Sequence, residues 1–259
     1  RWDFSLISLK QMAGFGHKIF LAGLLSSIYM QVYSILIGKR FSASELGYFN
    51  QSNTLSRFTS VTFMAVISRV VFSRQTKLQD DMNSLRQSYR SYLLHSGIII
   101  FPTCIFIALM SKELVCVIFG TDWKGMAPIL TLVSLSYMLT PMQVVNNDII
   151  NVRGRSDFFL KAEILKKGVG VILMIISLSF GLKVLLLSLL LYSLVDVVII
   201  AHFVKKVIGY KLLDQLKILS NLFSNPETLG NYEVSKDVVD DMVGTILDDD
   251  YTIKSLMSI

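Results

Sequence analysis

Residues 183–203 read KVLLLSLLLYSLVDVVIIAHF, an almost unbroken apolar run that carries a single acid, Asp196, near its middle. An α-helix needs about 20 apolar residues to cross the hydrocarbon core of a bilayer. Five other stretches of this chain resemble this run, and soluble domains rarely carry several of them. The sequence therefore predicts six membrane-crossing helices, at about residues 19–38, 58–73, 92–110, 126–150, 168–181 and 183–203.

The composition of the whole chain agrees with a membrane protein. Its mean hydropathy is +0.57, and 53% of its residues are hydrophobic. The alternative is a soluble protein with a very large apolar helical core, but a soluble chain of 259 residues needs a surface that water can wet. We therefore expect an all-α, polytopic membrane protein. The second span, 58–73, is short and contains Arg69, so its helix is expected to begin earlier, near Ser44.

The loops between the predicted spans differ in positive charge, and this difference predicts the orientation. Seventeen of the 25 Lys and Arg residues fall before the first span, in alternate loops and in residues 204–220 after the last span, while six fall in the other loops and two in the far tail. Because an excess of Lys and Arg marks the cytoplasmic side, both ends are expected there. Residues 1–220 are expected to form a six-helix lobe. Residues 221–259, with eight acids and two lysines, are expected to form an acidic cytoplasmic tail.

Several classes of function are disfavoured by the sequence. The net charge of +6 comes mostly from cations beside the spans, which indicates contact with anionic lipid rather than nucleic acid. Cys104 and Cys116 have no histidine cluster nearby, and no phosphate-binding loop or nucleophile elbow is present, so we expect no metal and no cofactor. One of the long loops between spans, residues 74–91, has only Asp80 and Asp81 as acids. We therefore expect no membrane-embedded enzyme that builds sugar polymers.

Three stretches of the chain resemble Wzx-type polysaccharide flippases, which belong to the multidrug/oligosaccharidyl-lipid/polysaccharide exporter superfamily. In order along the chain, they are FGHKIFLAGLLSSIYMQVYSILIGKRFSASELGYFN (15–50), FGTDWKGMAPIL (119–130) and NVRGRSDFFLKAEILKK (151–167). They resemble the start of the second half of such a flippase, the entry to its tenth span and the loop before its eleventh. The second lobe of this family has six spans and begins on the cytoplasmic side, in agreement with the charge pattern.

The resemblance implies a function in the bacterial inner membrane. Such a flippase moves an oligosaccharide linked to a polyprenyl pyrophosphate from the inner to the outer leaflet, during assembly of surface polysaccharide or lipopolysaccharide. The implied partners are the bilayer, the lipid-linked oligosaccharide and an N-terminal six-helix lobe, or a homologous lobe. The alternatives are a drug/cation antiporter of the same superfamily and a membrane fragment that does not transport.

Two residues inside the predicted spans are candidates for the pathway of a substrate or an ion. Asp196 lies within the last span, where a charge is costly and usually functional, so it could couple an ion or pair with a cation; a structural hydrogen bond is the alternative. Gln31 lies in the first span, on a polar stripe with Ser27 and Ser34. This stripe could line a sugar pathway or hold helices together.

The other candidates lie near the ends of spans. Arg57 and Arg69 could receive pyrophosphate at successive stages, or anchor the second helix at the two interfaces. Asn146 and Asn147 follow Pro141, which is expected to kink the fourth span, so they could form a hinge or a lip for substrate. In the following loop, Asp157 is expected to cap the next helix, and three lysines are expected to hold that helix at the headgroups: Lys161, Lys166 and Lys167.

Overall fold

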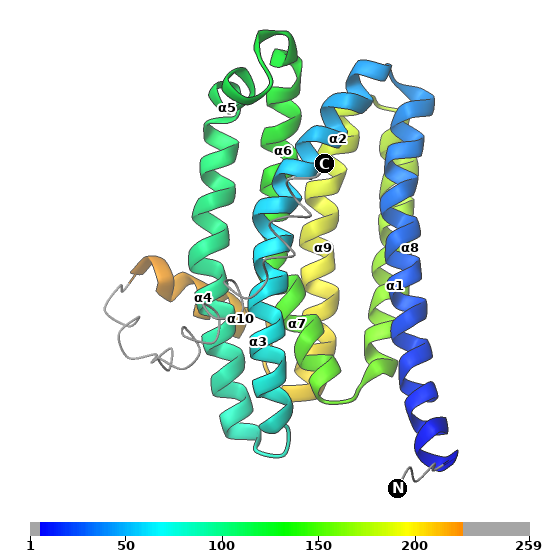
Figure 1. Cartoon of the computed structure of the whole chain (residues 1–259), viewed down its shortest axis with the longest axis vertical. Helices are drawn as coiled ribbons and strands as arrows, with labels where there is room; N and C mark the ends of the chain where they lie inside the picture. The colour runs from blue at the N-terminus through cyan, green and yellow to red at the C-terminus, as the bar shows by residue number, and fades with distance from the viewer. Residues whose placement is uncertain (1–5, 225–259) are drawn as a thin grey trace, which may run out of the picture.

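The computed structural model describes residues 6–224, with the side chains of residues 16–220, and every regular element in this range is a helix (Figure 1). The chain begins with the long helix α1 (Leu6–Arg40). The remaining elements, in order, are α2 (Ala43–Arg57), the π-helix η1 (Phe58–Thr62), α3 (Phe63–Lys77), α4 (Met82–Leu109), α5 (Ser111–Ile118), the 3₁₀-helix η2 (Thr121–Met126), α6 (Ala127–Tyr137), α7 (Thr140–Val152), α8 (Ser156–Leu178), α9 (Leu182–Ile208) and α10 (Leu212–Ser224).

Local sequence explains where the helices begin and end. The Ser42 side chain accepts a hydrogen bond from the backbone N–H of Glu45, and the Glu45 carboxylate accepts one from the backbone N–H of Ser42. This reciprocal pair stabilises the start of α2. Gly209 has a φ of 84°, and this left-handed conformation ends α9 and turns the chain into α10. The bundle is thus built from long helices joined by short turns.

Five helical stretches are long and apolar enough to cross a membrane, which confirms a membrane-spanning helical protein. They are Gly16–Arg40, Ala43–Lys77, Met82–Leu109, Thr121–Val152 and Leu182–Ile208. Side chains on the outside of the bundle are strongly apolar; Phe106, Ile172 and Ile175 are each more than half exposed. This surface suits contact with lipid, because apolar side chains leave no polar group that would lose its hydrogen bonds to water in the bilayer.

Two predicted spans have different bounds in the structure. The second does not start at residue 58, because α2, η1 and α3 form one continuous stretch from Ala43, close to the start expected near Ser44. The fourth is interrupted at Met138–Leu139, just before Pro141, and continues as α7. Proline lacks a backbone N–H and its ring clashes with the preceding turn, so the break falls where the kink was expected.

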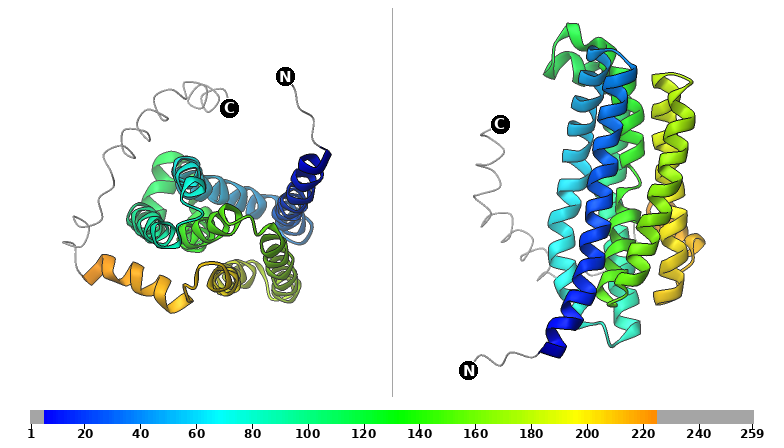
Figure 2. Two further views of the ribbon diagram at one scale, coloured as in Figure 1. Left: turned by 90° about the horizontal axis from the view of Figure 1, so that it is seen from below. Right: turned by 90° about the vertical axis from the view of Figure 1, so that its right-hand side faces the viewer.

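The fifth predicted span, 168–181, is not among the five stretches. It forms the second half of α8, whose first half carries several charged side chains, including Glu163, Lys166 and Lys167. α8 nevertheless packs along α1 and α9 at one side of the bundle, as Figures 1 and 2 show. The number of six crossings and the side on which the ends lie therefore stay predictions.

The bundle contains two larger apolar cores. One joins α3, α4, α7 and α9 around residues such as Leu93, Ile149 and Ile200, and the other joins α1, α8 and α9 around Tyr33 and Leu185. The predicted boundary at residue 220 falls inside α10, and the rest of the predicted acidic tail, residues 225–259, lies outside the described residues. Polar groups interrupt both cores, and they define the candidate site.

Candidate functional site

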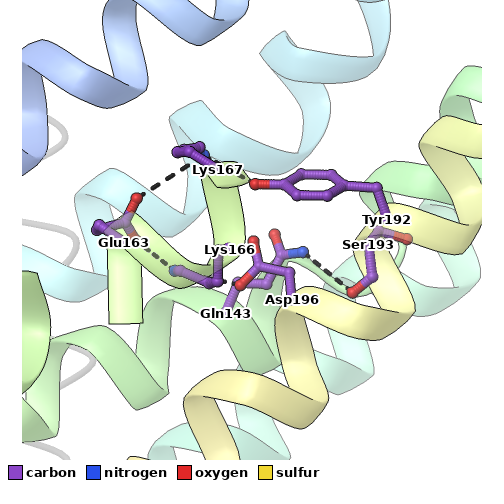
Figure 3. Close-up of polar contacts among 7 residues, drawn as sticks. All are labelled: Gln143, Glu163, Lys166, Lys167, Tyr192, Ser193 and Asp196. Carbon is purple, nitrogen blue, oxygen red and sulfur yellow. Dashed lines mark hydrogen bonds and ion pairs between the residues drawn. The ribbon is translucent and has the colours of Figure 1, made fainter. Parts of the chain in front are cut away.

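The most unusual feature of the bundle is a cluster of four charged side chains between α8 and α9 (Figure 3). Lys166 Nζ lies 3.2 Å from Asp196 Oδ1 and also forms an ion pair with Glu163. Lys167 Nζ lies 3.7 Å from the other oxygen of Glu163. Three of the four residues come from two turns of α8, and Asp196 comes from α9. We call these four residues, Glu163, Lys166, Lys167 and Asp196, the charge cluster.

The charge cluster is almost sealed from the outside of the bundle. The exposed fraction is 2% for Lys166, 5% for Glu163, 6% for Asp196 and 9% for Lys167. Two carboxylates and two ammonium groups give no net charge, which lowers the cost of placing them in a medium of low dielectric constant. Each ion still loses several kcal/mol of hydration on burial, so such a cluster is seldom retained for stability alone. It is therefore a candidate functional site by its chemistry.

Aromatic residues of α1 and α9 close the cluster on the side of Lys167. Its ammonium donates a hydrogen bond of 3.0 Å to the Tyr192 hydroxyl and lies 4.8 Å from the centre of the Tyr29 ring. The Tyr29 ring packs edge-on against Tyr33, with ring centres 5.4 Å apart. Both the Tyr29 and Tyr33 hydroxyls are buried without a hydrogen-bond partner. The cluster therefore adjoins two polar groups that still have hydrogen bonds to make.

Close approach of α1 and α8 at this point requires a glycine. A Cβ atom placed on Gly170 would lie 2.7 Å from Tyr192 Cε2 and would also collide with the Tyr29 hydroxyl. Gly170 therefore lets two tyrosine rings lie against the backbone of α8, one turn beyond Lys166 and Lys167. On the other side of the cluster, the Gln143 amide of α7 donates to the backbone carbonyl of Ser193, at 3.5 Å (Figure 3).

A second group of polar residues lies among α3, α4, α7 and α10. Asp148 Oδ2 accepts hydrogen bonds from the Ser68 hydroxyl, at 2.6 Å, and from the Tyr92 hydroxyl, at 3.1 Å. Two residues earlier on α7, Asn146 is fully buried; its Oδ1 accepts from Tyr89, at 2.6 Å, and its Nδ2 donates to Gln215 Oε1, at 2.9 Å. We call these six residues, Ser68, Tyr89, Tyr92, Asn146, Asp148 and Gln215, the hydrogen-bond network.

The structure does not bring the predicted site residues into one place. Asp196 belongs to the charge cluster, and Asn146 belongs to the hydrogen-bond network. Asn147 is partly buried, and its Oδ1 has no hydrogen-bond partner. The other three candidates are exposed side chains on three different helices: Gln31 on α1, Arg57 on α2 and Arg69 on α3.

The expectation that Lys166 and Lys167 lie at the headgroups is wrong. Both ammonium groups point inward to Glu163 and, for Lys166, to Asp196, whereas Lys161 is exposed. Asp157 does not cap α8 with its side chain. It instead accepts hydrogen bonds from Arg155, which hold the pKa of the Asp157 carboxyl below its ordinary value.

Sequence reasoning missed Glu163, although a signal was present. Glu163 precedes Lys166 by three residues and Lys167 by four, the spacings at which side chains of a helix meet. A helix that places an acid and two cations on one face beside an apolar run, followed by a helix with a lone central acid, indicates an interhelical ion pair. The sequence contains this pattern, but two lysines beside a span are also typical of a cytoplasmic loop.

Comparisons with known proteins support the family resemblance. The family described as "Polysaccharide biosynthesis protein" matches residues 1–128. The chain is 23% identical to the lipopolysaccharide biosynthesis protein WzxC of Escherichia coli over 63% of this chain and 33% of that protein. It is 24% identical to the teichuronic acid biosynthesis protein TuaB of Bacillus subtilis over 60% of this chain and 32% of that protein.

A third relative is an uncharacterized membrane protein in the cps region of Klebsiella pneumoniae, 24% identical over 51% of this chain and 27% of that protein. The match thus spans about a third of the length of each relative. No solved structure matches the chain.

Proposed function

Because the chain is similar to Wzx-type polysaccharide biosynthesis proteins, we propose that it forms one lobe of a transporter that flips a lipid-linked oligosaccharide across the inner membrane. The substrate would be an oligosaccharide on a polyprenyl pyrophosphate, destined for surface polysaccharide or lipopolysaccharide. Because the match spans about a third of each relative, we propose that a second six-helix lobe completes the transporter. In this proposal residues 1–220 are the membrane lobe and residues 221–259 a cytoplasmic extension.

The observation that carries the proposal is a polar stripe that α1 and α2 expose. Asn50, Thr54 and Arg57 follow one another at helical spacings on α2, and all three are exposed. The Ser34 hydroxyl of α1 donates to Asn50 Oδ1, at 3.1 Å, and exposed Gln31 lies one turn from Ser34. We call these five residues, Gln31, Ser34, Asn50, Thr54 and Arg57, the polar stripe.

The polar stripe does not suit contact with lipid tails. Hydrocarbon offers no hydrogen-bond partner, so exposed amide, hydroxyl and guanidinium groups within a span favour water or protein. Other parts of the outside of the bundle are apolar, for example around Ile172 and Ile175 of α8. The stripe therefore supports a water-filled cavity between this lobe and a second lobe, with the lipid tail of the substrate left in the bilayer.

Such a cavity needs no covalent chemistry to move its substrate. Amides and hydroxyls of the stripe can exchange hydrogen bonds with sugar hydroxyls, and the planar guanidinium of Arg57 can bind two oxygens of a pyrophosphate. Rocking of one lobe against the other would then open the cavity to alternate sides of the membrane. The charge cluster is buried between α8 and α9 and would serve as part of the lobe that moves.

The test is restoration of surface polysaccharide in a bacterium that lacks its flippase. The full chain is expressed together with a six-helix first lobe, and exported polysaccharide is measured at matched protein levels. Arg57→Gln removes a charge-assisted hydrogen bond worth about 1.5–3 kcal/mol, so export should fall about 10- to 100-fold. Arg57→Lys should retain part of the activity, since the charge remains.

The matched control is Lys124→Gln, which removes an exposed cation of the 3₁₀-helix η2, outside the polar stripe. Export by this variant should equal that of the unchanged chain. Normal export by Arg57→Gln, or equal loss in Lys124→Gln, would contradict a substrate pathway along the stripe. Export of a cationic drug without any polysaccharide would favour the antiporter instead.

A further inference from the structure

Helix α10 runs across the bundle rather than along it. In Figure 1 it extends sideways from the end of α9, and the view from below in Figure 2 shows it pointing away from the other helices. It packs on α4 and on the end of α9. A helix of this orientation cannot add a membrane crossing, so its position needs another explanation.

The inner face of α10 is firmly fixed to the bundle. Gln215 is fully buried and accepts the hydrogen bond from Asn146, while Ile218 and Leu219 are buried against the apolar core. A Cβ atom on Gly97 of α4 would lie 2.9 Å from Leu219 Cδ2, so α10 touches the surface of α4 directly. These contacts hold one face of α10 inward and leave the opposite face outward.

The outer face of α10 is amphipathic. Leu213 is 67% exposed and Leu216 is 46% exposed. Lys217 is exposed beside Leu216, and exposed Lys211 lies just before the helix. Two leucines flanked by two lysines, on a face that no other element of the described chain covers, form the pattern of a helix lying at a membrane surface.

The level of α10 along the bundle agrees with this pattern. Arg90 is the last charged residue of α4 before an uncharged stretch that continues to Leu109. α10 crosses α4 between Arg86, which lies against Gly209, and Gly97, which lies against Leu219. It therefore lies where the charged end of α4 gives way to its apolar part, which is the level of the headgroups.

Positive charge gathers at the same level. Arg86 donates a hydrogen bond of 2.8 Å to the carbonyl of Ile208 and lines a pocket of about 260 Å³ at the root of α10. Exposed Lys205 and Lys206 end α9 directly before the turn into α10. Together with Lys211 and Lys217, these side chains make an anionic bilayer the best match for the outer face.

We propose that the outer face of α10, formed by Leu213, Leu216 and Lys217, is a lipid-binding surface that lies in the headgroup region of an anionic leaflet. The leucines enter the outermost part of the acyl chains, and Lys211 and Lys217 contact lipid phosphates. Through Gln215 and Asn146, this surface bound to lipid also fixes α7, the helix that follows the break at Met138–Leu139. The proposal does not depend on which substrate the lobe transports.

The depth of α10 is testable with the full chain in liposomes that contain phosphatidylglycerol. A fluorophore is attached to Leu213→Cys in a chain whose two native cysteines are replaced. Quenching is compared for doxyl groups near the lipid headgroup, doxyl groups deep in the acyl chain, and iodide in water. We expect quenching at Leu213 to be about twofold or more stronger with the shallow doxyl group than with the deep one.

Two further labelled sites calibrate this measurement. Ile175→Cys, on the exposed face of α8, should be quenched mainly by the deep group. Asp80→Cys, in the turn between α3 and α4, should be quenched by iodide only. A Leu213 probe that behaves like Asp80, or that neither doxyl group nor iodide reaches, would overturn the proposal. Behaviour like that of Ile175 would also overturn it, because α10 would then lie in the hydrocarbon.

A second experiment tests the role of charge by comparing how strongly two spin-labelled lipids quench the fluorophore at residue 213. Spin-labelled phosphatidylglycerol should quench this probe more strongly than spin-labelled phosphatidylcholine, and replacing Lys211 and Lys217 by Gln should lower this preference about fivefold per lysine. Lys112→Gln, on an exposed cation of α5, is the matched control and should leave the preference unchanged. If the double variant kept the same preference for phosphatidylglycerol, α10 would not bind anionic headgroups through these lysines.

Discussion

The charge cluster and the hydrogen-bond network bury polar side chains in the same bundle by different means. In the charge cluster, each ammonium of α8 depends on a carboxylate, and Asp196 supplies one of them from α9. In the network, Asn146 and Asp148 are satisfied by hydroxyls and amides from α3, α4 and α10. Replacing one residue of the charge cluster leaves a buried charge without its counter-ion. Replacing one residue of the hydrogen-bond network leaves only a buried polar group without a hydrogen bond.

This difference also explains why α8 fails as an independent apolar span. Its first half carries charges that lipid would not accept, and these charges become tolerable only when α9 contributes Asp196. The hydrogen-bond network does not need a counter-ion from another helix, since α7 is held by neutral groups as well as by Asp148. The two regions should therefore respond to substitution with different magnitudes.

The largest effect is expected for Lys166→Ala. It leaves Glu163 and Asp196 buried without their shared cation, and breaking a buried ion pair costs about 3–5 kcal/mol of the free energy of unfolding. Denaturant unfolding of the purified chain in detergent measures this loss. Lys161→Ala, on an exposed residue of the same helix, is the control and should change stability by less than about 0.5 kcal/mol.

A double variant tests whether the effect comes from charge. Lys166→Met with Asp196→Leu removes one cation and one anion together and leaves Glu163 paired with Lys167. Its stability should lie closer to that of the unchanged chain than the sum of the single losses, by about 1–3 kcal/mol. Additive losses would mean that the cluster contributes packing rather than charge pairing.

An intermediate effect is expected for Gly170→Ala, which tests how tightly α1 closes the charge cluster. The added methyl group would press on the Tyr192 ring and on the Tyr29 hydroxyl, and overpacking of this kind costs about 1–3 kcal/mol. The same unfolding experiment reports it. Gly168→Ala is the control, since its Cβ would meet nothing within 4 Å, and alanine favours a helix. Equal stability of both variants would contradict the close contact of α1 with α8.

A smaller effect is expected for Asn146→Ala in the hydrogen-bond network. It removes the partner of the Tyr89 hydroxyl and of Gln215, and hydrogen bonds between membrane helices are worth about 0.6–1.7 kcal/mol each. The loss should therefore be about 1–2 kcal/mol and smaller than that of Lys166→Ala. Asn147→Ala should cost less, because Asn147 Oδ1 has no hydrogen-bond partner to lose. An Asn146→Ala loss as large as that of Lys166→Ala would remove the distinction between the two regions.

The sequence predicted the helical membrane fold because a long apolar run by itself indicates a membrane-spanning helix. The run at 183–203 became α9 with little change. The first half of the second span was harder to find, since Asn50, Gln51 and Asn53 dilute its apolar character. All three residues belong to α2, and Asn50 is part of the polar stripe, so one of the residues that lower the hydropathy of this helix also supports the proposed pathway.

The site was less predictable because its members meet only in three dimensions. Asn146 and Gln215 are 69 residues apart, and no local pattern predicts that α10 would cross back to α7. Lys166 was assigned to the headgroups because a lysine next to a span usually lies there. Only the packing of α8 on α9 places Lys166 opposite Asp196. The local sequence signal was the three-residue spacing between Glu163 and Lys166.

The smallest effect is expected for Asp148→Asn, and it isolates what separates the two buried carboxyl groups. An Asn side chain keeps the shape of Asp, and its carbonyl oxygen can still accept from the Ser68 and Tyr92 hydroxyls. The change in the free energy of unfolding should therefore stay below about 0.5 kcal/mol. Asp196→Asn is the matched substitution, and it should cost more, because it leaves two lysines in the charge cluster with only Glu163 to neutralise them. If Asp148→Asn proved as costly as Asp196→Asn, Asp148 would also depend on its charge, and the hydrogen-bond network would have to be counted as a second charged site.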